Sequence, residues 1–345
     1  ELYAATRRAA RGKRRRASVA RTLFYLEPTV LELQRRLRAG TWTPGASTNH
    51  VIHDGKTRTI TVAPFVDRIV HQALCSAIGP LLDRSLIHHT YACRVGLGTH
   101  AALRTATAWA RTYPWFAHLD VVKFFPTIDH ALLLAQLARD IPCPATLEIC
   151  RLIVVHGSRS IVPVRFHFPG DDLFTPLSRS VGLPIGNLTS QHFANRFLSP
   201  IDHRATDRRK IHAYLRYMDD VVLFGTSKAE VEDHTLALQD AFDRQRMRLH
   251  PWRVRRTREG VNFVGFRILP EEIRVRRTTV VRALRRLTAL STVHRGSPEQ
   301  TEALLRSLRA TLAHWEHADS YRLRTQLLTK MELLYDSSKP DEDEE

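Results

Sequence analysis

Two adjacent carboxylates stand out because apolar residues flank them on both sides. Asp219 and Asp220 lie between the apolar residues of 214–218 and the run at 221–224, and each run has the composition of a β-strand. Burying neighbouring acids in such a hairpin is costly unless a cation binds beside them. Hard divalent cations such as Mg²⁺ take carboxylate oxygens as ligands. The pattern predicts a strand–turn–strand that presents both carboxylates to metal, and the alternative is an acidic turn tip, because Asp favours turns.

A third acid shares this arrangement. Asp120 lies in the apolar run 115–122, and its carboxylate converges with the other two if the strands are neighbours in one sheet. Two Mg²⁺ ions held there would clamp the attacking 3′-oxygen and the leaving pyrophosphate of an in-line phosphoryl transfer. Phe125 follows closely, and its ring would stand under the sugar of an incoming nucleotide and exclude a 2′-hydroxyl. The alternative for Phe125 is packing in the core.

Hydrophobic periodicity predicts the elements that position these residues. The order of strands, helices and hairpins is typical of an α+β fold. Lys56 and Arg58 lie on a predicted hairpin that could fold over a triphosphate, and Pro80 is the expected end of one helix. Helices are expected over 29–38, 67–82, 101–113, 130–139, 144–155, 227–247 and within 278–335, hairpins over 51–62 and 214–224, and one or two strands over 260–268.

The charge of the chain predicts a polyanionic partner. Lys and Arg total 52 against 35 acids, which gives a net charge of +17, and Arg outnumbers Lys. Arg suits bidentate contact with phosphate, so nucleic acid is the simplest partner. The basic residues are spread through the chain rather than gathered on one amphipathic helix, and there is no apolar run of about 18 residues. We therefore expect no membrane partner and a cytoplasmic location.

Three segments carry further expectations. The basic segment 1–21 is expected to be a helix or arm on a phosphate backbone, or else a disordered tail. The irregular segment 156–181 is expected to be a surface loop in which Asp171 and Asp172 are solvated. The Arg-rich segment that leads into the C-terminal helices is expected to bind the minor groove of a duplex, or else to be a solvent-exposed face. Cys75 and Cys150 are expected in helical cores.

Six sequence blocks resemble those of reverse transcriptases, in the same order. The resemblance covers roughly residues 20–335. A set of six blocks in the correct order is specific, because composition does not generate it. The blocks are Arg68 within 65–71, 91–94 with 98–100, 120–130, 182–195, 217–220 and 260–268.

The resemblance implies a right-hand polymerase fold with fingers, a palm with an antiparallel sheet, and a helical thumb. It implies two Mg²⁺ ions, with Mn²⁺ as an alternative ion, held by Asp120, Asp219, Asp220 and the backbone of Val121. Asp120 and Asp219 are expected to bridge both ions, and Asp220 to be more peripheral. The implied domains are a basic extension (1–50), fingers (51–114), palm (115–270, with the inserted loop 156–181), thumb (271–335) and an acidic tail (336–345).

The resemblance also assigns substrate contacts. Incoming dNTP is expected at Lys56, Arg58, Phe124, Phe125 and Gln191. Template position and fidelity are expected to depend on Arg68, Arg94, Ile185 and Gly186. The thumb is expected to contact the RNA/DNA duplex through Arg274, Arg276, Arg277 and Arg282.

The turn at Ile185-Gly186, followed by Ser190-Gln191, is most similar to diversity-generating retroelement reverse transcriptases. This resemblance implies a bacterial or phage-encoded enzyme that copies template adenines with errors, with a small basic accessory protein and a structured RNA as partners. Arg253 stands where the family usually has a lysine. Two alternatives remain open, a reverse transcriptase of an antiphage defence system and a catalytically silent nucleic-acid-binding scaffold, and the three intact acids disfavour the scaffold.

Overall fold

The computed structural model describes residues 1–54, 56–292 and 298–336. The predicted acidic tail lies, apart from its first residue, outside this range. Within the described ranges, no helix has the length and apolarity needed to cross a bilayer. The chain forms two compact units, each assembled from separate stretches. Unit 1 comprises Glu1–Gly98, Leu119–Leu223 and Glu232–Arg253, and unit 2 comprises Thr99–His118, Phe224–Val231 and Val254–Glu345.

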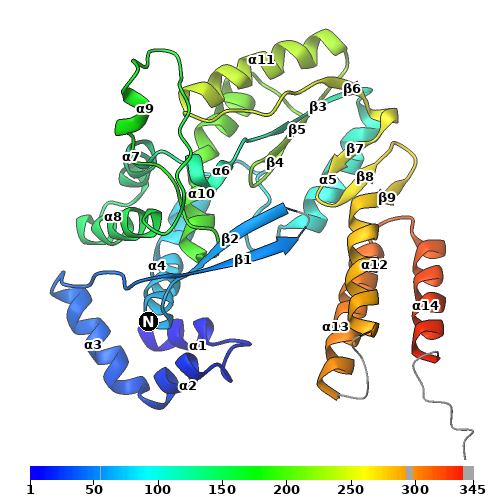
Figure 1. The fold of residues 1–345 in the computed structure, drawn as a ribbon. Coiled ribbons are helices and arrows are strands. Elements are labelled where there is room, and N and C mark those ends of the chain that lie inside the picture. The colour runs from blue at the N-terminus through cyan, green and yellow to red at the C-terminus, as the bar shows by residue number, and fades with distance from the viewer. Residues whose placement is uncertain (55, 293–297, 337–345) are drawn as a thin grey trace, which may run out of the picture. The chain divides into compact units, whose positions relative to one another are not determined.

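The basic N-terminal segment of unit 1 is helical. Helices α1 (Leu2–Ala9), α2 (Ala17–Phe24) and α3 (Leu26–Arg38) follow one another, and α1 packs on α4 (Phe65–Arg84) (Figure 1). Ala5, Ala10 and Val19 are fully buried, which explains why this segment folds. The expectation of a disordered tail was therefore wrong, although most of the arginines of this segment remain exposed.

Helix α4 continues past Pro80 to Arg84, so the predicted stop was wrong. Proline removes one helical hydrogen bond, and its ring also crowds the residue before it. Here the preceding residue is Gly79, which has no Cβ to be crowded. Ile78 and Leu82 are almost fully buried, so packing holds the last turn in place.

The predicted strands form antiparallel pairs, which confirms an α+β fold. Strands β1 (Thr48–Asp54) and β2 (Lys56–Val62) make the expected hairpin. Strands β4 (Tyr214–Tyr217) and β5 (Asp220–Gly225) make the second hairpin, with Tyr217 opposite Asp220. These two strands belong to a four-stranded sheet of order β4-β5-β3-β6, which also contains β3 (Trp115–Asp120) and β6 (Val254–Arg256).

Helices in unit 1 supply most of the core beside these strands. Phe193, Phe197 and Leu198 of α10 are completely buried, and α10 packs on α4 and α7. Cys75 in α4 and Cys150 in α8 are buried, as predicted. The remaining elements are α6 (Phe124–Thr127), α7 (His130–Asp140), α8 (Pro144–Ser158), α9 (Thr175–Ser178), α10 (Leu188–His203), η1 (Arg204–Arg208) and α11 (Lys228–Arg244), the last of which begins in unit 2.

The segment 156–181 is more ordered than the sequence suggested. The side chain of Asp171 is only 6% exposed and forms an ion pair with Arg179. Asp172 accepts hydrogen bonds from the backbone N–H groups of Phe174 (2.9 Å) and Thr175 (2.6 Å) at the start of α9. The prediction that both aspartates are solvated was wrong for Asp171, because its arginine partner lies eight residues away and is not visible as a local pattern.

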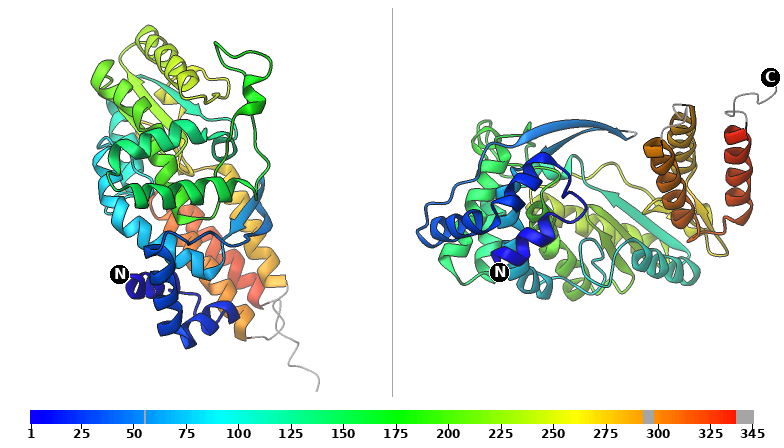
Figure 2. Two further views of the ribbon diagram at one scale, coloured as in Figure 1. Left: turned by 90° about the vertical axis from the view of Figure 1, so that its left-hand side faces the viewer. Right: turned by 90° about the horizontal axis from the view of Figure 1, so that it is seen from below.

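Unit 2 contains a three-stranded antiparallel sheet and a helical bundle. Leu287, Trp315 and Leu327 form the centre of the bundle core, and Figures 1 and 2 show α12 and α13 side by side. These elements confirm the predicted strand pair and the helical C-terminal region. The elements are α5 (Thr99–Thr112), η2 (Thr257–Glu259), β7 (Val261–Phe263), β8 (Phe266–Ile268), β9 (Ile273–Val275), α12 (Arg277–Thr292), α13 (Pro298–Trp315) and α14 (Tyr321–Asp336).

Candidate active site

The turn between β4 and β5 has an unusual backbone conformation. Met218 has a φ of 58°, in the left-handed region that disfavours residues with a side chain. A positive φ at the first central residue is typical of the tight hairpin turns in which glycine is common. Non-glycine residues in this region cost about 1–3 kcal/mol, so the surrounding contacts must hold the turn. The strained position lies directly before Asp219.

Asp120 ends β3 and is held beside an extended stretch of unit 1. The backbone carbonyl of Asp120 accepts a hydrogen bond from the N–H of His250 (2.9 Å), and Val122 N–H donates to the carbonyl of Arg248 (2.8 Å). The ring Nε2 of His250 lies 4.0 Å from Oδ2 of Asp120. The side chain of Val121 is buried, so only its backbone can serve a ligand.

The three carboxylates share one electrostatic environment. The pKa of the Asp219 carboxyl is raised to about 6, first by burial, then by the charge of Asp220 and, more weakly, by that of Asp120. A hydrogen bond from the backbone N–H of Asp219 and the charge of Arg58 act in the opposite direction. Asp120 and Arg58 therefore lie within electrostatic reach of the hairpin turn.

This environment fits a hard cation. Neighbouring carboxylates repel one another, and a divalent cation relieves that repulsion while taking oxygen ligands. Across the described residues, no group of three or more His, Cys, Asp or Glu side chains is arranged to hold a metal ion. The donor set is thus chemically suited to Mg²⁺, while the arrangement of its side chains is not that of a closed metal centre.

The two phenylalanines after Asp120 differ in exposure. Lys123, with a φ of 53°, turns the chain into α6. The ring of Phe124 is buried, whereas Phe125 is half-buried, and the two ring centroids are 5.3 Å apart. Phe125 therefore has the accessible ring of the pair. Its carbonyl accepts a hydrogen bond from Leu183 N–H (2.8 Å), which places the Gly/Pro turn of 182–186 next to it.

The same turn packs on the β1–β2 hairpin. The carbonyl of Ile185 accepts a hydrogen bond from Thr61 N–H at 2.8 Å. Gly186 has a φ of 116°, and a Cβ placed there would lie 2.9 Å from the carbonyl oxygen of Thr61 and 2.8 Å from Cγ2 of Ile60. Only glycine meets both demands without a shift in the strand. Ile185 and Gly186 are thus fixed against β2.

Three other predicted nucleotide contacts lie on two elements of unit 1, β2 and α10. Arg58 is exposed on β2. Gln191 is exposed on α10, and its Oε1 accepts a hydrogen bond from Cys93 Sγ (3.4 Å), which joins two of the predicted blocks. Lys56 begins β2, and its side chain lies outside the described part of the structure.

Arg68 and Arg94 have different surroundings. The Nε of Arg68 is buried and has no hydrogen-bond partner among the described residues, and its guanidinium lies 5.2 Å from the ring centroid of Phe65. Arg94 bonds to Asp83 (2.6 Å) and to the carbonyls of Ile87 (2.8 Å) and Thr90 (3.0 Å). Arg68 therefore has one unpartnered donor, which is buried, whereas the guanidinium of Arg94 is engaged in bonds within the chain.

The predicted thumb arginines all lie in unit 2. Arg274 is in β9 and pairs with Glu272, and Arg276 is half-buried before α12. Arg277 and Arg282 are exposed on α12.

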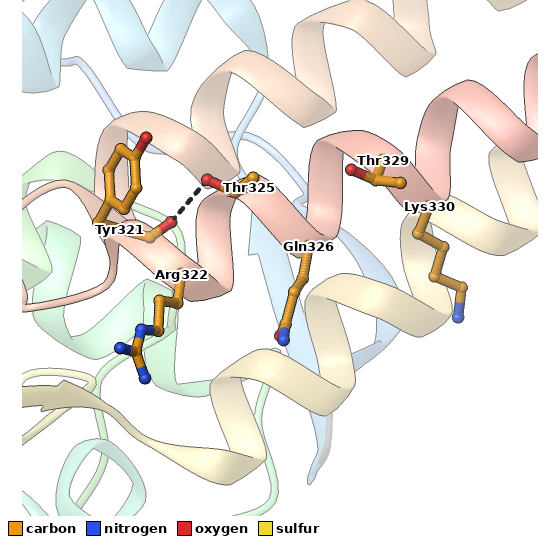
Figure 3. Close-up of a pocket in the computed structure, with 6 residues that line it drawn as sticks. All are labelled: Tyr321, Arg322, Thr325, Gln326, Thr329 and Lys330. Carbon is orange, nitrogen blue, oxygen red and sulfur yellow. Dashed lines mark hydrogen bonds between the residues drawn. The ribbon is translucent and has the colours of Figure 1, made fainter.

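A cavity of about 500 Å³ lies along another helix of this unit, α14, and none of the predicted site residues lines it (Figure 3). Its lining residues are Tyr321, Arg322, Thr325, Gln326, Thr329 and Lys330.

Sequence reasoning missed three residues beside the carboxylates. They are His250, Arg216 and Asp202, to which the sequence pattern gave no role. Arg216 and Asp202 in fact form a fully buried ion pair behind the turn (2.6 Å). The one available signal was a charged residue within an apolar strand, because buried charges are paired.

Comparison with known proteins identifies the family. Residues 49–268 match the reverse transcriptase (RNA-dependent DNA polymerase) family. This chain belongs to the reverse transcriptase family. The match confirms the resemblance drawn from the six sequence blocks, and with it the right-hand polymerase fold.

Individual relatives are distant. Protein YkfC of Escherichia coli (strain K12) is 24% identical over 260 residues, which are 66% of this chain and 67% of that protein. Telomerase from Candida albicans with a fragment of telomeric RNA has a TM-score of 0.48 at 12% identity, over 87% of this chain and 60% of that one. Apo telomerase from Candida tropicalis has a TM-score of 0.48 at 10% identity, over 71% and 59%. The chain thus spans about three fifths of each telomerase chain.

Proposed function

We propose that this chain is an RNA-directed DNA polymerase that makes cDNA on an RNA template. The observation that carries the proposal is that β3, which ends in Asp120, lies next to the β4–β5 hairpin with Asp219 and Asp220, in a chain of the reverse transcriptase family. A protein that only binds nucleic acid gains nothing from three acids that repel one another and the phosphates of its ligand. A polymerase needs them to bind cations.

The three carboxylates would contribute unequally to metal binding. Asp120 and Asp219 would be the main ligands of two Mg²⁺ ions, and Asp220 and the carbonyl of Val121 would complete the ligand set. When bound, these ions supply positive charge to the attacking 3′-oxygen and the leaving pyrophosphate. The protein itself orients the ligands, because β3 and the β4–β5 turn hold the acids at fixed positions. Preorganised positions of this kind are the main contribution that a polymerase makes.

The incoming dNTP would lie between the β1–β2 hairpin and the Phe125 segment. Arg58 is exposed and within electrostatic reach of Asp219, so its guanidinium is placed to pair with a triphosphate. The half-buried ring of Phe125 would stack under the sugar and exclude a 2′-hydroxyl, which selects dNTP over rNTP. Lys56, the backbone of Phe124 and Gln191 would complete this subsite.

Template and duplex would contact the basic residues outside the carboxylate cluster. Arg68 has an unpartnered donor, and Ile185 and Gly186 form the turn that packs on β2. Arg276, Arg277 and Arg282 would contact the phosphate backbone of the RNA/DNA duplex from the thumb, and Arg274 would do so beside its partner Glu272.

Within the family, we assign the chain to diversity-generating retroelement enzymes, which make errors opposite template adenines during mutagenic retrohoming. Support comes from the Ile185-Gly186 turn with Ser190-Gln191. Ile185 offers the templating base pair only an apolar contact, where glutamine would offer hydrogen bonds. The partners would be a small basic accessory protein and a structured RNA.

Primer extension tests the proposed activity. The chain, with dNTPs and Mg²⁺, should extend a DNA primer on an RNA template, and rNTPs should be used far less well. Mn²⁺ should replace Mg²⁺, because it takes the same oxygen ligands. No extension with either ion, even with accessory protein and cognate RNA present, would contradict the proposal.

Sequencing of the cDNA tests the subfamily assignment. Wild type should misincorporate mainly opposite template adenines, and Ile185→Gln should restore fidelity there while leaving errors opposite other bases unchanged. Equal error rates opposite all four bases in the wild type would reject the assignment without touching the polymerase proposal.

A further inference from the structure

Arg216 makes an unusually complete set of contacts directly before the carboxylate turn. Its side chain is fully buried on β4. Nε and Nη2 donate to the carboxylate of Asp202, at 2.8 Å to Oδ1 and 2.6 Å to Oδ2. Nη1 donates to the side-chain oxygen of Asn195 (3.1 Å) and to the backbone carbonyl of Met218 (2.9 Å). One guanidinium therefore joins helix α10 to the turn.

Asp202 has all of its acceptors engaged. Besides Arg216, it accepts hydrogen bonds from the hydroxyl of Tyr214 (2.8 Å) and from that of Thr90 (3.1 Å), and it is fully buried. A buried ion pair is tolerated when geometry is good and the remaining lone pairs are satisfied, as they are here. The pair is thus a fixed anchor inside unit 1.

The anchor acts on a strained residue. Met218 has its φ at 58°, and its carbonyl is the one that Arg216 binds. The next peptide unit carries Asp219. A hydrogen bond to the Met218 carbonyl restricts rotation of that peptide, and therefore restricts where the Asp219 side chain leaves the backbone.

The same network reaches a second segment. The backbone of Arg216 pairs with 89–91, through its N–H to the carbonyl of His89 (3.0 Å) and through its carbonyl to the N–H of Tyr91 (3.0 Å). Asn195 Nδ2 donates to the carbonyl of Ala92 at 2.6 Å. The loop that follows α4 is therefore held by the residues that hold the turn.

The geometry points to Arg216 as a positioning residue, which together with Asp202 and Asn195 fixes the strained Met218-Asp219 turn so that the carboxylates converge. This inference rests on the proposed polymerase function for its effect on rate, but not for its effect on the turn itself. Arg216 contacts the turn through its hydrogen bond to the Met218 carbonyl, and its charge lies within electrostatic reach of Asp219.

Arg216→Lys is the discriminating variant. Lysine keeps the positive charge beside Asp202, but a single ammonium cannot reach Asp202, Asn195 and the Met218 carbonyl at once, as the planar fork of arginine does. Arg196→Lys is the matched control. Arg196 lies on α10, the helix that also carries Asn195 and Asp202, and it is also buried. It pairs with Asp140 and the carbonyl of Gln136, and among the described residues it makes no hydrogen bond to the turn.

Two readouts are measured on both variants. The first is amide hydrogen exchange of a peptide spanning 217–221, which should be about tenfold faster in Arg216→Lys and unchanged in Arg196→Lys. The second is single-nucleotide addition, in which kcat should fall about 10- to 100-fold in Arg216→Lys, with duplex affinity and KM for dNTP within about twofold of wild type.

The two readouts separate the positioning role of Arg216 from the proposed function. Unchanged exchange at 217–221 in Arg216→Lys, or a loss of kcat equal to that of Arg196→Lys, would overturn the positioning role. An inactive wild type would contradict the proposed function instead, and the exchange comparison would still decide the role of Arg216. Asn195→Asp, which keeps the acceptor for Arg216 but removes the donor to Ala92, should leave exchange at the turn close to wild type.

Discussion

At the scale of single residues, the two adjacent aspartates have different surroundings. Asp219 occupies the turn, and burial and its acidic neighbours raise its pKa to about 6. Asp220 begins β5 and lies opposite Tyr217 in the register of the hairpin. A carboxylate with a raised pKa has the most to gain from a bound cation, because the cation removes the cost of its charge. The unequal roles of these acids stay a prediction, which replacement by asparagine tests.

We expect Asp220→Asn to be the mildest of the three neutral replacements. Loss of a peripheral oxygen ligand should lower the rate of nucleotide addition by about 10- to 100-fold, whereas Asp120→Asn should lose activity altogether. Rates of single-nucleotide addition at saturating Mg²⁺ measure this. Asp220→Asn as inactive as Asp120→Asn would mean that the two acids have equal roles.

His71 gives the stability of the folded chain a pH dependence. It is buried on α4, its Nδ1 has no hydrogen-bond partner among the described residues, and burial, followed by the charge of Arg68, lowers its pKa to about 4. The ordinary pKa of histidine is about 6.5, so the unfolded chain binds a proton between these values while the folded chain does not. The free energy of unfolding should therefore fall by up to about 3 kcal/mol as the pH drops from about 6.5 to 4.

Denaturant unfolding across this pH range measures the effect. His71→Gln cannot titrate, so its free energy of unfolding should lose less between pH 6.5 and 4 than that of the wild type. The same pH profile in both proteins would show that His71 does not stay neutral in the folded chain.

At the scale of elements, the turn at 182–186 joins the parts of the site. It bonds to the Phe125 segment through Leu183 and to β2 through Ile185. The template-side turn, the candidate sugar contact and the hairpin with Arg58 are thus connected by backbone hydrogen bonds. A shift of this turn is expected to move all three.

Gly186→Ala should disturb this connection. Its Cβ would meet the carbonyl oxygen of Thr61 at 2.9 Å, and its φ of 116° is unfavourable for alanine. Gly170→Ala is the control, because Gly170 also has a positive φ, 92°, but no atom lies within 4 Å of an added Cβ. We expect KM for dNTP to rise about tenfold in Gly186→Ala and to stay unchanged in Gly170→Ala. Equal effects would mean that contact with β2 is unimportant.

The elements around the site were largely predictable, and the contacts between them were not. Alternating apolar residues revealed both hairpins, and helical periodicity revealed α7 and α11, because these signals are local. The predictions for Pro80 and Asp171 were wrong. Buried packing of the last turn of α4 overrides the helix-breaking preference of Pro80, and the ion pair with Arg179, eight residues away, overrides the solvation expected for Asp171. Arg216 and Asp202 lie 14 residues apart in sequence and meet only through the fold. No local pattern could pair them.

At the scale of the whole molecule, the basic residues expected to bind nucleic acid are different from the acids proposed to carry the reaction. The net charge of +17 is spread through the chain, from the exposed arginines of the N-terminal segment to Arg277 and Arg282 on α12. Binding of a duplex by so many cations depends on counterion release and weakens steeply with salt. The proposed catalysis depends instead on three acids in unit 1. One replacement can therefore remove synthesis without removing binding.

Asp219→Asn tests this separation most directly. Wild type and variant are compared for single-nucleotide addition and for affinity toward the same RNA/DNA primer–template at one fixed salt concentration. We predict that the variant adds no nucleotide while its duplex affinity stays within about twofold of wild type, because the asparagine removes one acid from a strongly basic surface. Nucleotide addition by Asp219→Asn at the wild-type rate would contradict the assignment of the carboxylate turn as the active site.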